Sequence, residues 1–198
     1  CLHGLLTQVR YPRFAGTRGS PRDYTEFPAQ FMEHYATQPE VLAVYAKHAG
    51  TGEVIPQAMV DKLRAASTHN QGFKTTEYIA ASLLDLSWHK LGPSEAAAVE
   101  DATLFEDEMM AAYGKPQEVE SRYRSPYFAH IFAGGYSAGY YAYLWSEILD
   151  ADGFTAFKET GDIFNAELAQ RLKENVYQAG GLRDADVLYR QFRGKDPS

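Results

Sequence analysis

Apolar residues recur at helical spacing along most of the chain, and the alternation typical of strands is almost absent. Prolines and glycines mark a loop over 10–22. Helical patterns occupy 1–8 (the last turns of a helix), 26–35, 39–49, 56–66, 75–91, 96–110 and three shorter closing segments, 154–160, 165–176 and 185–192. The pattern predicts one all-α unit over 1–198.

The segment 75–91 carries apolar residues on more than one face, too many for a surface helix. We therefore expect it to be among the most buried helices and to pack on at least two neighbours. Ser94 is predicted to cap the helix over 96–110, since serine accepts backbone N–H groups at a helix start and Glu95 follows in the first turn.

Composition narrows the function classes. The 198 residues are 45% hydrophobic and 23% charged, as in an ordinary globular protein. A net charge of −7 without a basic stripe argues against a nucleic-acid partner. The single cysteine, Cys1, excludes an internal disulfide, and no apolar run approaches the roughly 18 residues that would span a membrane. Because the chain starts at Cys1 without Met, we expect it to be a fragment.

The first candidate for chemistry is Glu26, which lies among apolar residues just before Pro28. It fits a first-turn carboxylate that stabilises the helix dipole. It also fits a metal ligand from a second helix, since catalytic zinc commonly takes two histidines and one carboxylate. Glu33 and His34 are alternative ligands, but adjacent helical residues point in different directions. Both interpretations of Glu26 stay open on the pattern.

Three glycines, Gly134, Gly135 and Gly139, interrupt the aromatic segment 127–145. Glycine permits close backbone approach and unusual dihedral angles, which suits a loop that folds over a ligand. We expect 133–140 to be more mobile than the helix that follows.

The same segment carries a possible tyrosine face. If the chain is helical after Gly135, Tyr136, Tyr140 and Tyr143 share one face at i, i+4 and i+7. Such a face is either a packed aromatic stripe of the core or the wall of a polar cavity, which would satisfy three buried hydroxyls more easily. The spacing alone does not decide between them.

Other catalytic motifs are missing from the sequence. It has no Gly-x-Ser-x-Gly elbow, no phosphate-binding loop and no His-Glu-x-x-His. His3 has no second histidine four residues away.

Four stretches together resemble a known family: CLHGL, PRDYTEFPAQFMEHYATQPEV, YFAHIFAGGYSAGYYAYLW and RQFRGKDP. In this order they are similar to the C-terminal catalytic portion of the thimet-oligopeptidase family of zinc metallopeptidases, from Cys1 to about Lys195. In that family a His-Glu-Phe-Gly-His motif runs almost directly into Leu-His-Gly, which would place the motif immediately before Cys1. Within the family, EFPAQFMEHYATQPEV and SLLDLSWH look most like bacterial dipeptidyl carboxypeptidases. Oligopeptidase A is the nearer rival, since its glycine–tyrosine segment is almost the same.

The resemblance assigns roles by position. Glu26 matches the third zinc ligand, and His130 matches a histidine near the reacting carbonyl of the substrate. Tyr136 and Tyr143 match two active-site tyrosines, with Tyr143 the stronger candidate for stabilising the oxyanion. The three glycines match the flexible loop over the cleft.

The resemblance implies an all-α, C-terminal helical part of a zincin-type catalytic domain that starts just after the zinc-binding helix. The parent would be a peptidase with one Zn²⁺ ion that hydrolyses short peptides, releasing C-terminal dipeptides. The chain alone would be inactive, would hold zinc weakly or not at all, and would need the missing upstream part as its partner. A cytoplasmic location is favoured and a periplasmic one stays open. The alternatives are an endopeptidase like oligopeptidase A and a non-catalytic helical interaction module.

Overall fold

The computed structural model describes residues 2–198, which divide into two compact units. The first unit joins the described residues up to Ile55 with Ala142–Ser198, and the second is Pro56–Tyr141. Among the described residues the only β-type pairing is an isolated antiparallel bridge between Lys47 and Val54. The predicted all-α fold is confirmed.

The first unit consists of the short helices at the start of the chain, of α3 and α4, and of the long helix α10 with the elements that follow it. Its elements are α1 (Leu2–Leu6), η1 (Pro12–Phe14), α2 (Gly16–Gly19), η2 (Arg22–Tyr24), α3 (Phe27–Ala36), α4 (Pro39–Tyr45), α10 (Ala142–Glu159), α11 (Ala166–Leu172), the π-helical turn η4 (Lys173–Gln178) and α12 (Ala185–Arg193). The second unit contains α5 (Gln57–Ser67), α6 (Gln71–Lys90), α7 (Pro93–Ala97), α8 (Ala102–Ala112), η3 (Ser125–Tyr127) and α9 (Ala129–Phe132).

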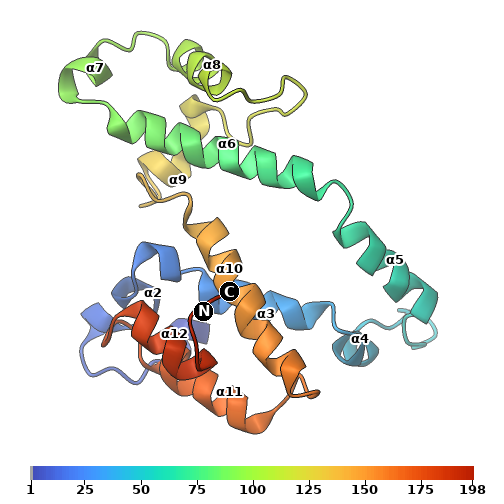
Figure 1. Ribbon diagram of the computed structural model, residues 1–198. Helices are drawn as coiled ribbons and strands as arrows, with labels where there is room; N and C mark the ends of the chain where they lie inside the picture. Colours follow the sequence, from blue (N-terminus) through green and yellow to red (C-terminus); the bar gives the residue numbers. More distant parts are fainter. Residues whose placement is uncertain (1) are drawn as a thin grey trace. The chain divides into compact units, whose positions relative to one another are not determined.

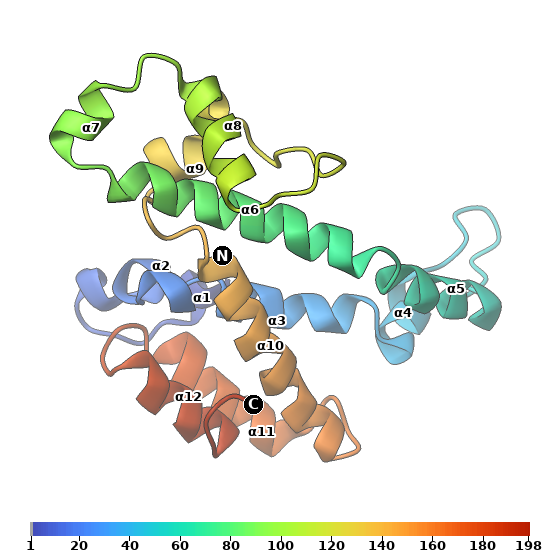
Figure 2. The ribbon, with the colours of Figure 1, turned by 45° about the horizontal axis from the view of Figure 1, so that its top comes forward.

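The core of the first unit forms where α3 packs against α10, as both ribbon views show (Figures 1 and 2). Phe31 of α3 lies with its ring centroid 5.9 Å from that of Phe154 and 5.7 Å from that of Phe157, and all three rings are buried. Each such ring stabilises the fold by about 1.5–3 kcal/mol through burial. At Gly153 a Cβ atom would lie 3.2 Å from the ring of Phe192. The missing side chain therefore leaves room for the aromatic rings around α10.

A buried ion pair ties the end of the chain to this core. The guanidinium of Arg193 donates to Asp152 at 3.1 Å and to Glu159 at 2.9 Å, and the Tyr189 hydroxyl donates to Asp152 at 2.7 Å. Burial by itself would raise the pKa of Asp152, but hydrogen bonds from Tyr189, Arg193 and Ser198 outweigh it and hold that pKa below its ordinary value. The closing Arg-Gly-Lys segment is thus anchored on α10.

In the second unit α8 packs along α6 (Figure 2). Burial on α6 is confined to residues 80–87, whereas Phe73 and Ile79 are 47% and 41% exposed. The segment 75–91 was expected to be among the most buried helices, and this is confirmed for 80–87, where six side chains are buried. Phe73 precedes that segment, and Ile79 near its start faces solvent.

One buried carboxylate, Asp85 of α6, holds the glycine–tyrosine segment. It is 0% exposed and accepts the backbone N–H groups of Ala138 at 2.9 Å and Tyr140 at 2.8 Å. The ring of His89, one turn along α6, lies 2.8 Å from the same carboxylate. Its two oxygens thus fix the end of the segment that was predicted to be mobile.

Two predicted helix boundaries are wrong. Ser94 lies inside the short helix α7, and the next helix is capped instead by Asp101, whose side chain accepts the N–H groups of Thr103 and Leu104 at 2.7 and 3.1 Å. Asp101 stands immediately before the helix and so caps it, whereas Ser94 lies too far upstream. The short helix predicted over 154–160 is the second half of the long helix α10. Packing of α10 against α3 stabilises the longer helix, and Gly153 leaves the room that this packing needs.

No helix within residues 2–198 combines the length and the apolar content needed to cross a membrane.

The Asp152 network predicts an acid dependence of stability. Because the folded chain lowers the pKa of Asp152, this stabilisation is complete above the unfolded value of 3.8 and is lost as the pH falls through the folded value. The Asp152→Asn variant is expected to lose about 1.5–3 kcal/mol at neutral pH and to decline less steeply in acid. Urea unfolding across this pH range measures both effects, with Asp61→Asn, an exposed aspartate, as control. An undiminished acid dependence in Asp152→Asn would contradict the prediction.

The Asp85 anchor predicts which amides of the glycine–tyrosine segment are protected. An asparagine keeps the shape but offers a single acceptor oxygen, so Asp85→Asn is expected to speed hydrogen exchange at Ala138 or Tyr140 about tenfold. Hydrogen exchange read by NMR resolves the two amides, with Asp107→Asn as the control on exposed α8 surface. Unchanged exchange at both amides would show that Asp85 does not hold the segment.

Candidate functional site

Glu26 is the N-cap residue of α3, immediately before the helix begins at Phe27. Its φ and ψ are −87° and −18°, and its side chain makes no capping hydrogen bond to the helix. The helix starts here because Pro28 falls in the first turn, where no backbone N–H is needed. Glu26 is half-buried.

A cavity of about 350 Å³ opens beside Glu26. The residues that line it are Leu2, His3, Thr17, Thr25, Glu26, Pro28, Ala29, Met32 and Tyr177. His3 is 5% exposed, and its ring meets that of Tyr177 edge-on at 6.1 Å. Burial lowers the pKa of His3, so the buried ring favours its neutral form. The sequence pattern had left His3 without a role, and the structure places it in the cavity of Glu26.

Tyr143, the second residue of α10, belongs to the same unit as Glu26 and is half-buried. Two hydrogen bonds join its helix to the segment around Glu26. The Gln30 side chain donates from Nε2 to the carbonyl oxygen of Tyr143 at 3.3 Å, and the Ser146 hydroxyl donates to the carbonyl oxygen of Asp23 at 3.1 Å. The predicted zinc ligand and the predicted oxyanion donor thus stand at the starts of two joined helices.

The other predicted site residues belong to the second unit. His130, in α9, lies with its ring centroid 6.1 Å from that of Tyr136 and 5.6 Å from that of Tyr140. Tyr123 contacts the other side of this cluster, 5.0 Å from the His130 ring. The structure therefore brings His130 and Tyr136 together, as the assignment of both to one site requires.

The predicted tyrosine face is wrong as a helical face. The chain forms turns from Ser137 to Tyr141, and α10 begins only at Ala142. Tyr140 is 2% exposed, and its hydroxyl accepts from Arg122 Nε at 3.2 Å, so this tyrosine is a core residue. The glycines and the bonds to Asp85 favour turns over helix here.

Two of the glycines are required by the backbone. At Gly134 a Cβ atom would lie 2.9 Å from the Cα and carbonyl oxygen of His130, and Gly135 has a φ of +80°. The chain therefore turns directly after α9 in a way that requires glycine at these two positions. Gly139 is buried, and its N–H donates to the carbonyl oxygen of Tyr136 at 2.8 Å.

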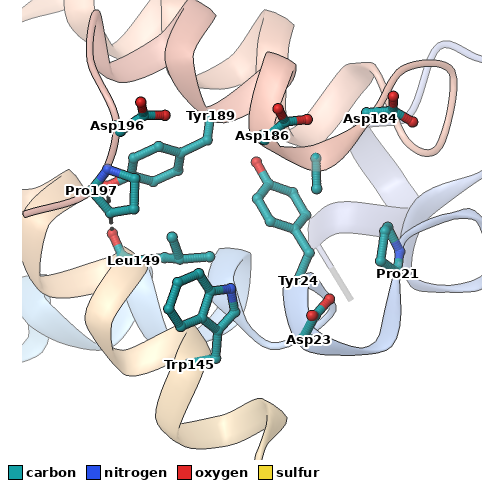
Figure 3. A pocket seen from close by; sticks show the side chains of 11 residues that line it. Pro21, Asp23, Tyr24, Trp145, Leu149, Asp184, Asp186, Tyr189, Asp196 and Pro197 are labelled. Carbon is teal, nitrogen blue, oxygen red and sulfur yellow. Dashed lines mark hydrogen bonds between the residues drawn. The ribbon is translucent and has the colours of Figure 1, made fainter.

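A second pocket of the first unit, of about 320 Å³, is acidic and aromatic (Figure 3). Figure 3 shows Trp145 and Leu149 of α10 below Tyr189 of α12. The remaining lining residues are Pro21, Asp23, Tyr24, Asp184, Ala185, Asp186, Asp196 and Pro197. Arg190 forms ion pairs with both Asp186 and Asp196. None of the predicted site residues lines this pocket.

Within residues 2–198, no group of three or more His, Cys, Asp or Glu side chains is arranged to hold a metal ion. Glu26 offers one carboxylate, where a catalytic zinc ion needs about three protein ligands. The donor type fits zinc, and the remaining ligands would have to come from outside these residues.

Sequence reasoning missed two residues that the structure brings into this description. Asp85 belongs to no recognisable motif. Its contacts are with backbone N–H groups some fifty residues later in the chain, which the sequence pattern does not reveal. Gln30 sits one turn after Glu26 in EFPAQ, and its link to Tyr143 appears only once α3 and α10 meet. The spacing of neither residue could have revealed these contacts.

Several curated proteins are similar to the chain over almost its whole length. The dipeptidyl carboxypeptidase of Escherichia coli (strain K12) is 44% identical over 197 residues, which are 99% of this chain and 28% of that protein. Oligopeptidase A of Salmonella typhimurium is 37% identical over the same shares, and saccharolysin of Saccharomyces cerevisiae is 29% identical over 100% of the chain and 27% of its own length.

The chain therefore spans little more than a quarter of the length of these relatives. A sequence profile described as Peptidase family M3 matches residues 1–198. With the family match over the full chain, the all-α fold and the whole-chain similarity to named peptidases, the chain belongs to peptidase family M3.

Proposed function

We propose that this chain is the C-terminal part of the catalytic domain of a zinc metallopeptidase that cleaves short peptides and releases C-terminal dipeptides. The 44% identity to a dipeptidyl carboxypeptidase supports this choice of reaction. The 37% identity to oligopeptidase A keeps an endopeptidase as the second candidate. A peptide with a blocked C-terminus distinguishes the two, because only an endopeptidase would cleave it without recognising a free end.

One observation carries the proposal. Glu26 immediately precedes α3 as its N-cap residue, and Tyr143 lies in the first turn of α10. The two helices are packed together and joined through Gln30. A metal ligand and an oxyanion donor must keep a fixed separation, since a transition state is stabilised only by groups aimed in advance. Two helices held by a shared aromatic core provide such a separation.

In this proposal Glu26 supplies one carboxylate ligand, and two histidines and a general-base glutamate come from a segment that would precede Cys1. When bound, zinc would polarise the scissile carbonyl group and acidify a water molecule. The cavity that Glu26 lines supports its assignment as a ligand.

The hydroxyl of Tyr143 donates to the carbonyl oxygen on which negative charge develops during attack. Tyr136 and His130, which lie against each other in the second unit, contact the substrate near the reacting group. By the resemblance, Gly134, Gly135 and Gly139 form the loop over the peptide, and movement of that loop would occur at Gly134 and Gly135, before the part that Asp85 holds. These roles rest on the family resemblance and on the pairing of His130 with Tyr136.

The partners proposed are short peptides and the rest of the same protein. The second partner is supported by the share of the relatives that the chain spans, which is 28% of the dipeptidyl carboxypeptidase. Large apolar side chains that are exposed and would be available to that partner are Leu5, Val44, Met59, Leu63, Leu104 and Phe132. The location stays a prediction, with the cytoplasm favoured by the resemblance.

Replacing the Tyr143 hydroxyl tests the oxyanion role. In the intact parent enzyme, Tyr143→Phe is expected to lower kcat about 10²–10³-fold and to change KM far less, because the lost bond exists mainly in the transition state. Steady-state kinetics on a short peptide measures both. Tyr127→Phe, at a 61% exposed tyrosine, is the matched control and should retain full kcat. A Tyr143→Phe enzyme with unchanged kcat would overturn the assignment.

Replacing Glu26 tests the metal role. Glu26→Ala in the parent is expected to lower zinc retention after dialysis against a chelator, because one of about three protein ligands is lost. Metal content measured by atomic emission reports this directly, and Glu33→Ala, at an exposed position on the same helix, is the control. Equal zinc retention in both variants would show that Glu26 is not a ligand.

A further inference from the structure

Gln30 is placed between the two groups on which the proposed chemistry depends. It lies one helical turn after Glu26, and its backbone N–H donates to the carbonyl oxygen of Glu26 at 2.9 Å. Its side chain reaches the neighbouring helix, where Nε2 donates to the carbonyl oxygen of Tyr143 at 3.3 Å. One residue therefore touches both the start of α3 and the first turn of α10.

The side chain of Gln30 gains little stability for the fold from its hydrogen bonds. Its acceptor oxygen Oε1 is buried and has no hydrogen-bond partner within residues 2–198. A buried acceptor without a partner costs as much as or more than one neutral hydrogen bond contributes, so an apolar side chain of the same length would serve the fold at least as well. A carboxamide at this position indicates a requirement other than stability.

The packing of α3 on α10 does not need Gln30. The buried rings of Phe31, Phe154 and Phe157 already join the two helices, and the Ser146 hydroxyl bonds to the Asp23 carbonyl. These contacts hold the second turn and the second half of α10. The bond made by Gln30 lies nearer the start of α10, at the carbonyl oxygen of Tyr143 in its first turn.

We propose that Gln30 is a positioning residue: its carboxamide fixes the first turn of α10 against the turn of Glu26, and so sets the direction in which the Tyr143 hydroxyl points. This inference rests on the proposed function, in which Tyr143 donates to the oxyanion. A displacement of that hydroxyl by a fraction of an ångström weakens the bond in the transition state without removing any group that binds substrate or zinc.

The first test is Gln30→Met in the intact parent enzyme, which keeps the length of the side chain and removes its hydrogen bonds. We expect kcat to fall about 10- to 100-fold, with KM and zinc content close to the unmodified enzyme. The matched control is Gln38→Met, since Gln38 Nε2 also bonds a backbone carbonyl, that of His34, within its own segment. Gln30→Asn, too short to reach α10, serves as a second variant and should lower kcat in the same way.

A double-mutant cycle separates positioning from a general structural effect. If Gln30 acts through the Tyr143 hydroxyl, Gln30→Met should lower kcat strongly in the unmodified enzyme and by less than about twofold in the Tyr143→Phe background. A structural defect would lower kcat by the same factor in both backgrounds.

The outcomes distinguish failure of the proposed function from failure of the role proposed for Gln30. If Tyr143→Phe alone leaves kcat unchanged, the proposed function is overturned and this inference with it. If Tyr143→Phe lowers kcat but Gln30→Met has no effect, or has an equal effect in both backgrounds, only the role of Gln30 is overturned. Loss of zinc in Gln30→Met would also overturn it, because the residue would then support Glu26 instead of Tyr143.

Discussion

The packing of α3 against α10 is the contact on which the first unit depends. Phe31, Phe154 and Phe157 are buried in it, and the absence of a side chain at Gly153 leaves room for the surrounding rings. Because α10 begins some 115 residues after α3 in the chain, this contact closes a long loop and must outweigh the corresponding entropy. The concentration of aromatic residues at this crossing supplies the burial that does so.

The position of the candidate site follows from that contact. Glu26 begins one helix and Tyr143 lies at the start of the other, so their separation is set by the crossing and not by a flexible loop. In the second unit a buried carboxylate has the corresponding effect, since Asp85 accepts two backbone N–H groups of the glycine–tyrosine segment. Near Gly134 and Gly135 the turns are instead held by backbone bonds to α9, from Gly134 to Ala129 and from Tyr136 to His130.

The two errors in predicting the helices have different physical origins. At α8 one local cap replaces another, since serine and aspartate are both good caps and the pattern does not rank Ser94 below Asp101. At α10 the sequence pattern predicts a helix only over 154–160, whereas the helix runs through Gly153, where the rings of Phe192, Phe27 and Phe31 occupy the space beside the missing side chain. Only at α10 do tertiary contacts outweigh a local preference, because glycine lowers helix propensity.

The sequence by itself determined the all-α fold, the start of α3 beside Glu26 and the family, because helical periodicity, proline position and long ordered motifs are local properties of the chain. Only the tertiary structure decided that Tyr140 is a core residue while Tyr143 starts α10, that His3 lines the cavity of Glu26, and that Gln30 joins α3 to α10. The physical reason is that each of these facts is a contact between residues far apart in the chain. Such contacts depend on how helices pack, and spacing along the sequence carries no record of that packing.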